Sequence, residues 1–233
     1  LRHAVGSESI VGIPMRVSAD YIIGYILFGV VLTLTGGGDF FMNLSLALMG
    51  RRRGGPAKVA ILSSATMGSL SGSVISNILV TGRITIPIMK RTGYPPHYAA
   101  AVEACASTGG TLMPPIMGTV AFIMASFLGI EYGQVVMAAL LPALLFYIAL
   151  LFQVDCHAAR HNLGAIEAEH LPGVVKTLKE GWPFILSFAV LVWLLVSVRI
   201  ERQAPYIAAL LMIVICVLDP RRNFRLKDLG DIF

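Results

Sequence analysis

The chain has 233 residues, of which 56% are hydrophobic and only 13% are charged, and its mean hydropathy is +0.78. A water-soluble domain of this length cannot bury that much apolar surface, so the composition excludes a purely soluble protein and indicates that lipid covers much of the chain. The net charge of +5 does not indicate a nucleic-acid partner, because the basic residues stand in clusters between apolar runs, a pattern that sets membrane topology.

Residues 1–50 predict one membrane span followed by a helix that lies in the membrane interface. Ala19 to Thr35 is a continuous apolar run and forms the expected span. Phe40 to Met49 is too short to cross about 30 Å of hydrocarbon and is interrupted by Asn43 and Ser45. We therefore expect this second segment to lie in the plane of the interface and to lead into a basic loop.

Residues 51–91 predict a re-entrant hairpin with its basic loop. The apolar stretch Val59 to Gly82 is interrupted by GSLSGSVISN, which covers Gly68 to Asn77. Length alone would allow one straight crossing helix. Because basic clusters both precede and follow the stretch, a single crossing would place one cluster on the wrong side, whereas a hairpin leaves both on the cytoplasmic face. Irregular backbone at membrane depth is tolerated only inside protein or beside a water-filled cavity, so the tip is expected to mark a pathway.

Residues 92–130 predict a broken membrane helix. The run from His97 to Leu128 is too long for one straight crossing. Its break is expected at STGGTLMPP, Ser107 to Pro115, because the two glycines lower helix propensity and the two prolines remove backbone donors.

Residues 131–233 predict further spans at Gln134 to Phe152 and Trp182 to Val198, and a marginal apolar run from Pro205 to Leu218. His157 to Glu180 is expected to be a cytoplasmic connector, and a basic tail contains Arg221, Arg222, Arg225 and Lys227. Of the 18 Lys and Arg residues, this topology leaves only Arg2, Arg16, Arg199 and Arg202 outside. The predicted fold is therefore all-α and polytopic, with a re-entrant helical hairpin and a broken transmembrane helix.

The hairpin tip and the helix break contain the candidate binding residues. Unwound carbonyls suit a cation, and the N-terminal end of a half-helix suits a substrate carboxylate. The predicted cation site, mostly of backbone carbonyls, comprises Ser71, Gly72, Ser73, Gly109, Gly110 and Pro114. The predicted substrate-binding residues are Ser73, Ser76, Asn77 and Thr108. The competing interpretation is that these Gly and Pro residues only kink structural helices.

Glu103 and a histidine pair support a second hypothesis. Glu103 lies within AAAVEACAS and is either a proton or cation coupling group or, as we prefer, a residue near the cytoplasmic end that reaches water or a basic side chain. His157 and His161 have a metal-compatible spacing, but a solvated connector is the expected interpretation. A membrane-embedded enzyme would need Glu103 and the histidines to converge, and they fall in separate segments. An enzyme is therefore not expected, and an ion channel is the other alternative.

Several long motifs resemble one protein family. GDFFMNLSLALMGRRRGGPAKVAI, SLSGSVISN, TIPIMKRTGYPPHYAAAVEACASTGGTLMPPIMG and AFIMASFLG are similar to the tripartite ATP-independent periplasmic (TRAP) transporter permease, in the form with fused small and large subunits. The resemblance is strong over Tyr21 to Ile130. It implies that this chain is the first of two inverted repeats of the large subunit, one half of the transporter, with the second hairpin outside it.

The resemblance also implies a function. Such a secondary transporter of the bacterial inner membrane takes up a small organic acid from a periplasmic solute-binding protein, coupled to a Na⁺ or H⁺ gradient and without a covalent cofactor. On the family pattern, Ser71, Gly72 and Ser73 match the hairpin tip, and Gly109, Gly110, Pro114 and Pro115 match the unwound break.

Overall fold

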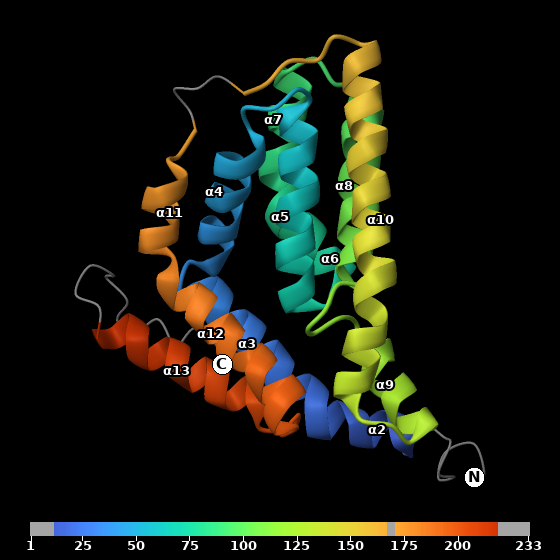
Figure 1. The fold of residues 1–233 in the computed structure, drawn as a ribbon, viewed down its shortest axis with the longest axis vertical. Coiled ribbons are helices and arrows are strands. Elements are labelled where there is room, and N and C mark those ends of the chain that lie inside the picture. The colour runs from blue at the N-terminus through green and yellow to red at the C-terminus, as the bar shows by residue number, and fades with distance from the viewer. Residues whose placement is uncertain (1–11, 167–170, 219–233) are drawn as a thin grey trace. The chain divides into compact units, whose positions relative to one another are not determined.

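The computed structural model describes residues 12–166 and 171–218, and every regular element within them is a helix, which confirms the all-α prediction (Figure 1). The predicted basic residues of the tail lie outside the described residues. The chain divides into two compact units. Unit one comprises Leu1–Gly37, Thr119–Met137 and Gly181–Phe233, and unit two comprises Gly38–Gly118 and Ala138–Glu180.

Unit one is built from apolar helices. They are α2 (Ile13–Val17), the π-helical turn η1 (Ser18–Ile22), α3 (Ile23–Leu34), α9 (Thr119–Leu128), the start of α10 (Tyr132–Arg160), α12 (Trp182–Trp193), the π-helical turn η4 (Leu194–Val198) and α13 (Ala204–Leu218). α13 packs against both α3 and α12. Gly24 makes the first of these contacts possible, because a Cβ atom there would lie only 2.8 Å from Cγ of Pro205.

Aromatic rings hold α9 and the start of α10 to α3 within unit one. The ring of Phe122 stacks on Tyr132 at 4.0 Å between centroids and lies 4.9 Å from the ring of Tyr25. Stacked rings bury large apolar areas with defined geometry, so these contacts fix how the short helix α9 lies against α3.

Unit two is organised around one buried helix. Its elements are α4 (Gly37–Met49), α5 (Gly55–Ser71), α6 (Val74–Asn77), the π-helical turn η2 (Ile78–Gly82), α7 (Arg83–Arg91), α8 (Pro96–Gly110), most of α10 and α11 (Val174–Glu180). α5 packs against both α7 and α8 (Figure 1). Its side chains beyond Lys58 are apolar or small and hydroxylated, so it is buried on nearly all sides.

Two polar contacts anchor α10 within unit two. Asp155 accepts hydrogen bonds from Arg53, at 2.5 Å, and from Lys58, which joins the basic loop to α10. The hydroxyl of Tyr147 donates to the carbonyl oxygen of Ala106 at 2.9 Å, which joins α10 to α8. Because these bonds lie at different levels of α10, they fix both its position and its direction beside the hairpin.

The predicted spans correspond to helices, with differences at their ends. Among the described residues, Ile13–Leu34 and Tyr132–Arg160 are long and apolar enough to cross a membrane. The two predicted segments near the C-terminus are also helical, as α12 with η4 and as α13. The span predicted to end at Phe152 belongs to a helix that continues to Arg160, so the first residues of the predicted connector are helical, and its cytoplasmic placement stays a prediction. α4 is helical as expected, and its placement in the interface stays a prediction.

Backbone contact between α5 and α8 depends on two facing glycines. A Cβ atom on Gly110 would lie 2.6 Å from Cα of Gly68, which no real side chain tolerates. We expect Gly68→Ala to lower the unfolding free energy of the full-length protein by about 1–3 kcal/mol, the usual cost of overpacking. The measurement is thermal unfolding in detergent.

Gly164→Ala is the matched control, because nothing lies within 4 Å of a Cβ atom built at Gly164. Its midpoint should equal that of the wild type. Equal midpoints for both variants would contradict the close approach of α5 and α8.

Candidate functional site

The hairpin tip is a two-residue reversal between α5 and α6. Gly72 has a left-handed backbone, with φ 60°, and Ser73 is extended, with φ −120°. Oγ of Ser73 accepts a hydrogen bond from the backbone N–H of Ser76 at 3.4 Å and so caps α6. Glycine adopts the left-handed conformation without steric cost, which explains why the chain reverses at this position.

The two arms of the hairpin run back along each other. Nδ2 of Asn77 donates to the carbonyl oxygen of Ser64 at 2.9 Å, and the hydroxyls of Ser64 and Thr81 lie 3.2 Å apart. At the opposite end of the hairpin, a Cβ atom on Gly54 would lie 3.0 Å from the hydroxyl of Tyr94. The basic loop before α5 and the turn after α7 are therefore neighbours, and the predicted hairpin is confirmed as a chain reversal.

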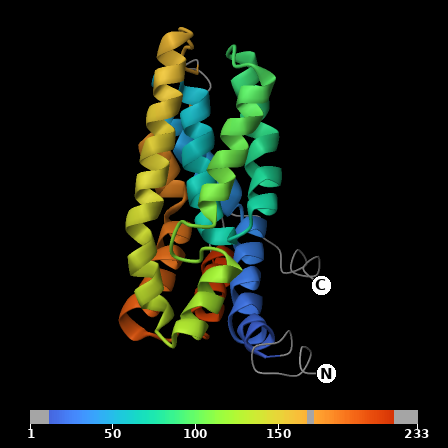
Figure 2. The same cartoon turned by 90° about the vertical axis from the view of Figure 1, so that its right-hand side faces the viewer.

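The break after α8 lies against the hairpin tip. Residues 111–118 are not helical, so the break begins slightly later than the sequence predicts. The backbone N–H of Ile116 donates to the carbonyl oxygen of Ser69 at 3.2 Å, and a Cβ atom on Gly72 would collide with the carbonyl oxygen of Met117. The two predicted breaks therefore meet within unit two, where the non-helical segment after α8 passes beside the end of α5 (Figure 2).

The predicted substrate residues have different exposures. Ser73, Ser76 and Thr108 are exposed, and the Thr108 hydroxyl donates to the carbonyl oxygen of Ala104 in its own helix at 2.8 Å. Asn77 is buried in the contact between the hairpin arms, with 1% of its surface exposed. The exposed hydroxyls keep lone pairs that can accept from a ligand, whereas Asn77 lies inside the protein.

The predicted cation residues surround the same contact. Ser71 and Gly72 are half-buried at the tip, and Oγ of Ser71 accepts from the backbone N–H of Ser73 at 3.4 Å. The carbonyl oxygens of Gly109 and Gly110 accept bonds from the N–H groups of Leu112 and Met113, at 3.0 and 3.2 Å. Each carbonyl keeps a second lone pair, so these bonds leave room for one further ligand on each oxygen.

The glycines of the break also have a packing function. Gly109 lies against the rings of Phe146 and Tyr147, and a Cβ atom there would come within 3.0 Å of Cζ of Tyr147. Gly110 faces the backbone of Gly68. Pro114 is half-buried beside them and is joined to Pro115 by a cis peptide bond.

One polar atom at this contact has no partner. Oδ1 of Asn77 is buried and, within the part of the chain that the structure describes, accepts no hydrogen bond. The Nδ2 atom of the same side chain is fixed by Ser64, which leaves Oδ1 as an oriented acceptor. A buried carbonyl oxygen of this kind is suited to a cation or to a hydrogen-bond donor that completes it.

The preferred prediction for Glu103 was wrong. Its side chain is 0% exposed, so it does not reach bulk water, and it forms no contact with a basic side chain in the part of the chain that the structure describes. Oε1 accepts bonds from the hydroxyls of Thr81, of Ser64 at 3.1 Å and of Ser107 at 3.3 Å, and Oε2 accepts from Thr85 at 2.5 Å. None of the ion pairs formed by the described residues includes Glu103. α8 turns this residue toward α5 and η2 rather than toward the loops.

The hydroxyl partners of Glu103 were missed, although the sequence contained a signal. Thr81 and Thr85 are four residues apart, as are Glu103 and Ser107, so each pair shares one helix face. An acid and three hydroxyls on two such faces predict a buried polar contact if the helices pack together. Ser64 lies on α5, and only the tertiary structure shows that it also contacts Glu103.

The histidines lie apart from this cluster. The ring of His157 stacks on Tyr98 at 3.7 Å and lies 4.4 Å from the ring of His161. No group of three or more metal-ligating side chains occurs among the described residues. Glu103 contacts only hydroxyls and His157 contacts only other rings in these interactions, so the convergence that an enzyme would need is not observed.

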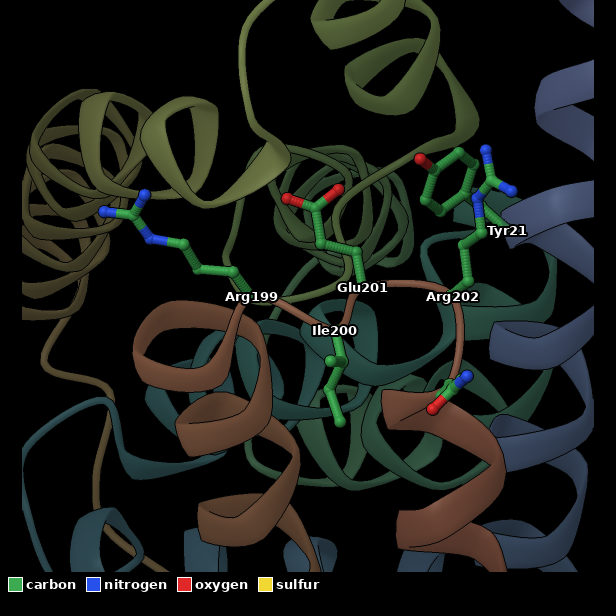
Figure 3. Close-up of a pocket in the computed structure, with 6 residues that line it drawn as sticks. Tyr21, Arg199, Ile200, Glu201 and Arg202 are labelled. Carbon is green, nitrogen blue, oxygen red and sulfur yellow. The ribbon is translucent and has the colours of Figure 1, made fainter.

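Unit one contains a small pocket at the turn between η4 and α13. It is lined by Tyr21, Arg199, Ile200, Glu201, Arg202 and Gln203 (Figure 3). Its charged groups already have partners: Arg199 pairs with Glu131 at 2.9 Å, Arg202 with Asp20 at 3.0 Å, and Glu201 accepts from the N–H of Gly133 at 3.3 Å. These bonds stabilise the turn, so the pocket is a structural feature.

An all-α chain in which a hairpin tip meets a helix break has an arrangement typical of membrane transporters, whose irregular backbone lies inside protein or lines a cavity. The family model described as "Tripartite ATP-independent periplasmic transporter, DctM component" matches residues 3–233. The chain therefore belongs to the DctM family of TRAP transporter permeases.

Curated relatives agree with this assignment. The chain is 32% identical to a putative TRAP transporter large permease protein of Haemophilus influenzae, over 60% of the chain and 32% of the relative. It is 25% identical to the C4-dicarboxylate TRAP transporter large permease protein DctM of Vibrio cholerae, over 88% of the chain and 44% of the relative.

A third relative is the 2,3-diketo-L-gulonate TRAP transporter large permease protein of Escherichia coli, at 26% identity over 60% of the chain and 32% of the relative. The chain spans less than half the length of each of these three relatives. The family and these permeases make the chain part of a membrane transport protein and not of an enzyme.

The turn in unit one gives a pH prediction. Burial raises the pKa of Glu201, more than the N–H groups of Gly133 and Tyr132 lower it. A raised carboxyl pKa favours folding while the group is protonated, and this contribution is lost as pH rises from the unfolded value of about 4.3 through the raised folded value. We therefore expect the melting temperature of the wild type, measured relative to that of Glu201→Gln, to decrease as the pH is raised through this range. A constant difference would contradict the burial of Glu201.

Proposed function

We propose that this chain is the first repeat of a TRAP large permease subunit that imports a small organic acid, delivered by a periplasmic solute-binding protein and driven by a Na⁺ or H⁺ gradient. The named solutes of two relatives support the substrate class, since C4-dicarboxylates and 2,3-diketo-L-gulonate are organic-acid anions. Fusion to the small subunit stays a prediction.

The contact between the hairpin tip and the helix break carries the proposal. Transporters place solute and coupling ion where broken helices meet, because unwound backbone offers carbonyls to the cation and donors to an anionic solute. Here Oδ1 of Asn77 is an acceptor for which the described residues provide no donor. The carbonyls of Gly109 and Gly110 at the break accept one backbone bond each, so they can supply further oxygen ligands to a cation there.

Exposed hydroxyls at the same contact provide the substrate part of the site. Ser73 and Ser76 can each orient a hydroxyl toward a carboxylate, which accepts several such bonds, and the Thr108 hydroxyl can do so when it leaves the carbonyl of Ala104. Glu103 is buried and turned to other partners, so it adds no exposed negative charge that would repel an anionic solute.

The proposed location is the bacterial inner membrane, with the hairpin re-entering from the cytoplasmic side. The basic loop before α5 and the turn after α7 are neighbours, as a re-entrant hairpin requires. Basic residues next to membrane segments favour the cytoplasmic face, so both flanks are placed there.

Cysteine labelling of the full-length transporter tests this topology. In a background without Cys105, Cys156 and Cys216, we expect cysteines placed at Arg52 and Lys90 to react with an impermeant reagent from the same side of the membrane. A cysteine placed at Gln203 should react from the opposite side. Reaction of the Arg52 and Lys90 positions from opposite compartments would replace the re-entrant hairpin with an ordinary crossing.

Uptake into proteoliposomes tests the site and the coupling. The full-length permease and its binding protein should accumulate a radiolabelled C4-dicarboxylate only when a Na⁺ or proton gradient is imposed. Asn77→Leu should reduce uptake about tenfold or more, because a hydrogen bond or ligand bond to a charged group contributes about 1.5–3 kcal/mol.

Gln153→Leu is the matched control, since it removes an exposed amide on α10 and should leave uptake unchanged. Melting temperatures of both variants separate loss of the site from loss of the fold. Uptake that persists after both gradients collapse would exclude gradient coupling, and full uptake by a folded Asn77→Leu variant would exclude the proposed site.

A further inference from the structure

The part of α10 that belongs to unit two has two faces with different surroundings. The buried face packs against the core of that unit and comprises Ala143, Tyr147, Val154 and Ala158. A second face repeats at the same spacing of three or four residues and comprises Leu141, Leu145, Ile148 and Phe152. Each of these four apolar side chains is at least 46% exposed. A continuous exposed apolar stripe of this kind marks a surface that an apolar partner covers.

The length of this stripe matches one leaflet of a bilayer. At about 1.5 Å per residue, Leu141 and Phe152 lie about 16 Å apart along the helix, close to half of the roughly 30 Å hydrocarbon thickness. Cys156 and Arg160 continue the same face at the next two turns, and both are exposed. An apolar stripe that ends in a cation follows the change from acyl chain to headgroup in a phospholipid.

The end of α10 lies next to the basic loop before α5 and the turn after α7. The backbone N–H of Gly54 donates to the carbonyl oxygen of Leu163 at 3.4 Å, and the N–H of Ile166 donates to that of Gly50 at 3.0 Å. On the side of the turn, a Cβ atom on Gly93 would lie 3.3 Å from Cδ2 of Leu163. Three segments that are distant in the sequence therefore meet at this end of unit two.

These three segments carry a strong positive charge. Their exposed basic residues are Arg51, Arg52, Arg53, Lys90, Arg91 and Arg160. The acid that the structure describes in these segments is Asp155, which pairs with Arg53 and Lys58. Glu167 and Glu169 of the connector lie outside the described residues. Like charges repel one another within a Debye length of about 10 Å, so a bound anion stabilises this arrangement.

We propose that the exposed face of α10 and the basic residues at its end bind a phospholipid with an anionic headgroup. An acyl chain lies along the stripe from Leu141 to Phe152, and the phosphate lies at Arg160 and the arginines of the loop. Guanidinium groups suit this position, because their planar fork matches two phosphate oxygens. The inference goes beyond transport, and only the assignment of the lipid to the cytoplasmic leaflet rests on the proposed topology.

The charge favours a lipid over a second copy of this chain on the same face. Two copies in one membrane have the same orientation, so a contact through this face of α10 would bring two basic ends together. An anionic headgroup instead has the charge opposite to that of the protein surface. A second copy is therefore an alternative that the experiments below distinguish.

Native mass spectrometry of the purified full-length transporter tests the headgroup. Phosphatidylglycerol should bind about tenfold or more tightly than phosphatidylcholine with the same acyl chains, because each basic residue near an anionic headgroup adds attraction. The double variant Arg52→Gln with Arg160→Gln should lose this preference. Lys176→Gln with Lys179→Gln removes the same charge from exposed positions on α11 and should keep it. Equal binding of both lipids to the wild type, or a preference that persists in the arginine variant, would overturn the proposal.

A second set of measurements distinguishes a lipid from the other occupants. Phe152→Gln alters a side chain that is 68% exposed, so it should keep the wild-type melting temperature and weaken phosphatidylglycerol binding. Val175→Gln is the matched control, since Val175 is 66% exposed on α11, and it should bind the lipid as the wild type does. Unchanged lipid binding by Phe152→Gln would exclude the apolar stripe from the site.

Soluble anions and the number of chains complete this test. Inorganic phosphate and glycerol 3-phosphate should not displace phosphatidylglycerol, because they lack the acyl chain. Displacement by either one would overturn the lipid in favour of a free phosphate group. The same spectra report the oligomeric state, and a dimer that Phe152→Gln converts to monomers would assign the face to a second copy.

Lipid binding needs neither a solute nor an ion gradient, so it is measured independently of transport. A transporter that imports the C4-dicarboxylate but binds both lipids equally would overturn this inference and leave the proposed function intact. A transporter that prefers phosphatidylglycerol but shows no uptake under any gradient would overturn the proposed function and support the lipid site.

Discussion

The contact between the hairpin and α8 depends on one constraint: each buried polar group must find its partner within the contact itself. Helices satisfy their own backbone, so the constraint falls on the side chains. Glu103 provides the acceptor for the hydroxyls of Ser64, Thr81 and Ser107. The Nδ2 group of Asn77 donates to the carbonyl of Ser64, which satisfies one of the two polar atoms of that amide. These bonds select one register between the hairpin arms and α8, because a shift along the axis would leave the carboxyl facing apolar groups.

Close backbone approach is the second requirement, and it positions the candidate site. Gly68 and Gly110 allow α5 and α8 to touch, and Gly72 allows the tip to reach the carbonyl of Met117. The small residues are therefore not only helix breakers, as the competing sequence interpretation proposed. They also allow the hairpin tip and the break to touch, so the same small residues produce both the helix interruptions and the contact. Gly82 has a related function, since a Cβ atom there would lie 3.1 Å from Cγ of Glu103.

Two polar contacts of different kinds therefore lie along one hairpin. The contact at the tip is formed by backbone carbonyls and an amide oxygen, which suit a cation. The contact nearer the middle is formed by a carboxyl and hydroxyls, whose donors and acceptors satisfy one another. Asn77 and Thr81 connect them through successive turns, since the hydroxyl of Thr81 reaches both the carbonyl of Asn77 and Glu103. The two contacts are thus joined through the hydroxyl of Thr81.

Much of the helical architecture could be predicted from local signals. The reversal at Gly72 and the break after Gly110 follow from glycine and proline, and the hairpin follows from basic clusters on both flanks. The end of α10 could not be placed, because the polar residues after Val154 have adequate helix propensity and pack against the start of α8 through His157 and Tyr98. The apolar pattern alone ends at Phe152, and it does not show how far the helix continues into the polar residues that follow.

The sequence by itself determined the helical class, the membrane character, and the two chain breaks, because apolar length, charge clusters and backbone-restricted residues act locally. Only the tertiary structure decided that Glu103 is enclosed by hydroxyls and that Oδ1 of Asn77 is buried with no donor among the residues the structure describes. A polar residue in an apolar helix can face a loop, lipid or another helix at similar local cost, and its surroundings are set by which distant helix packs against it.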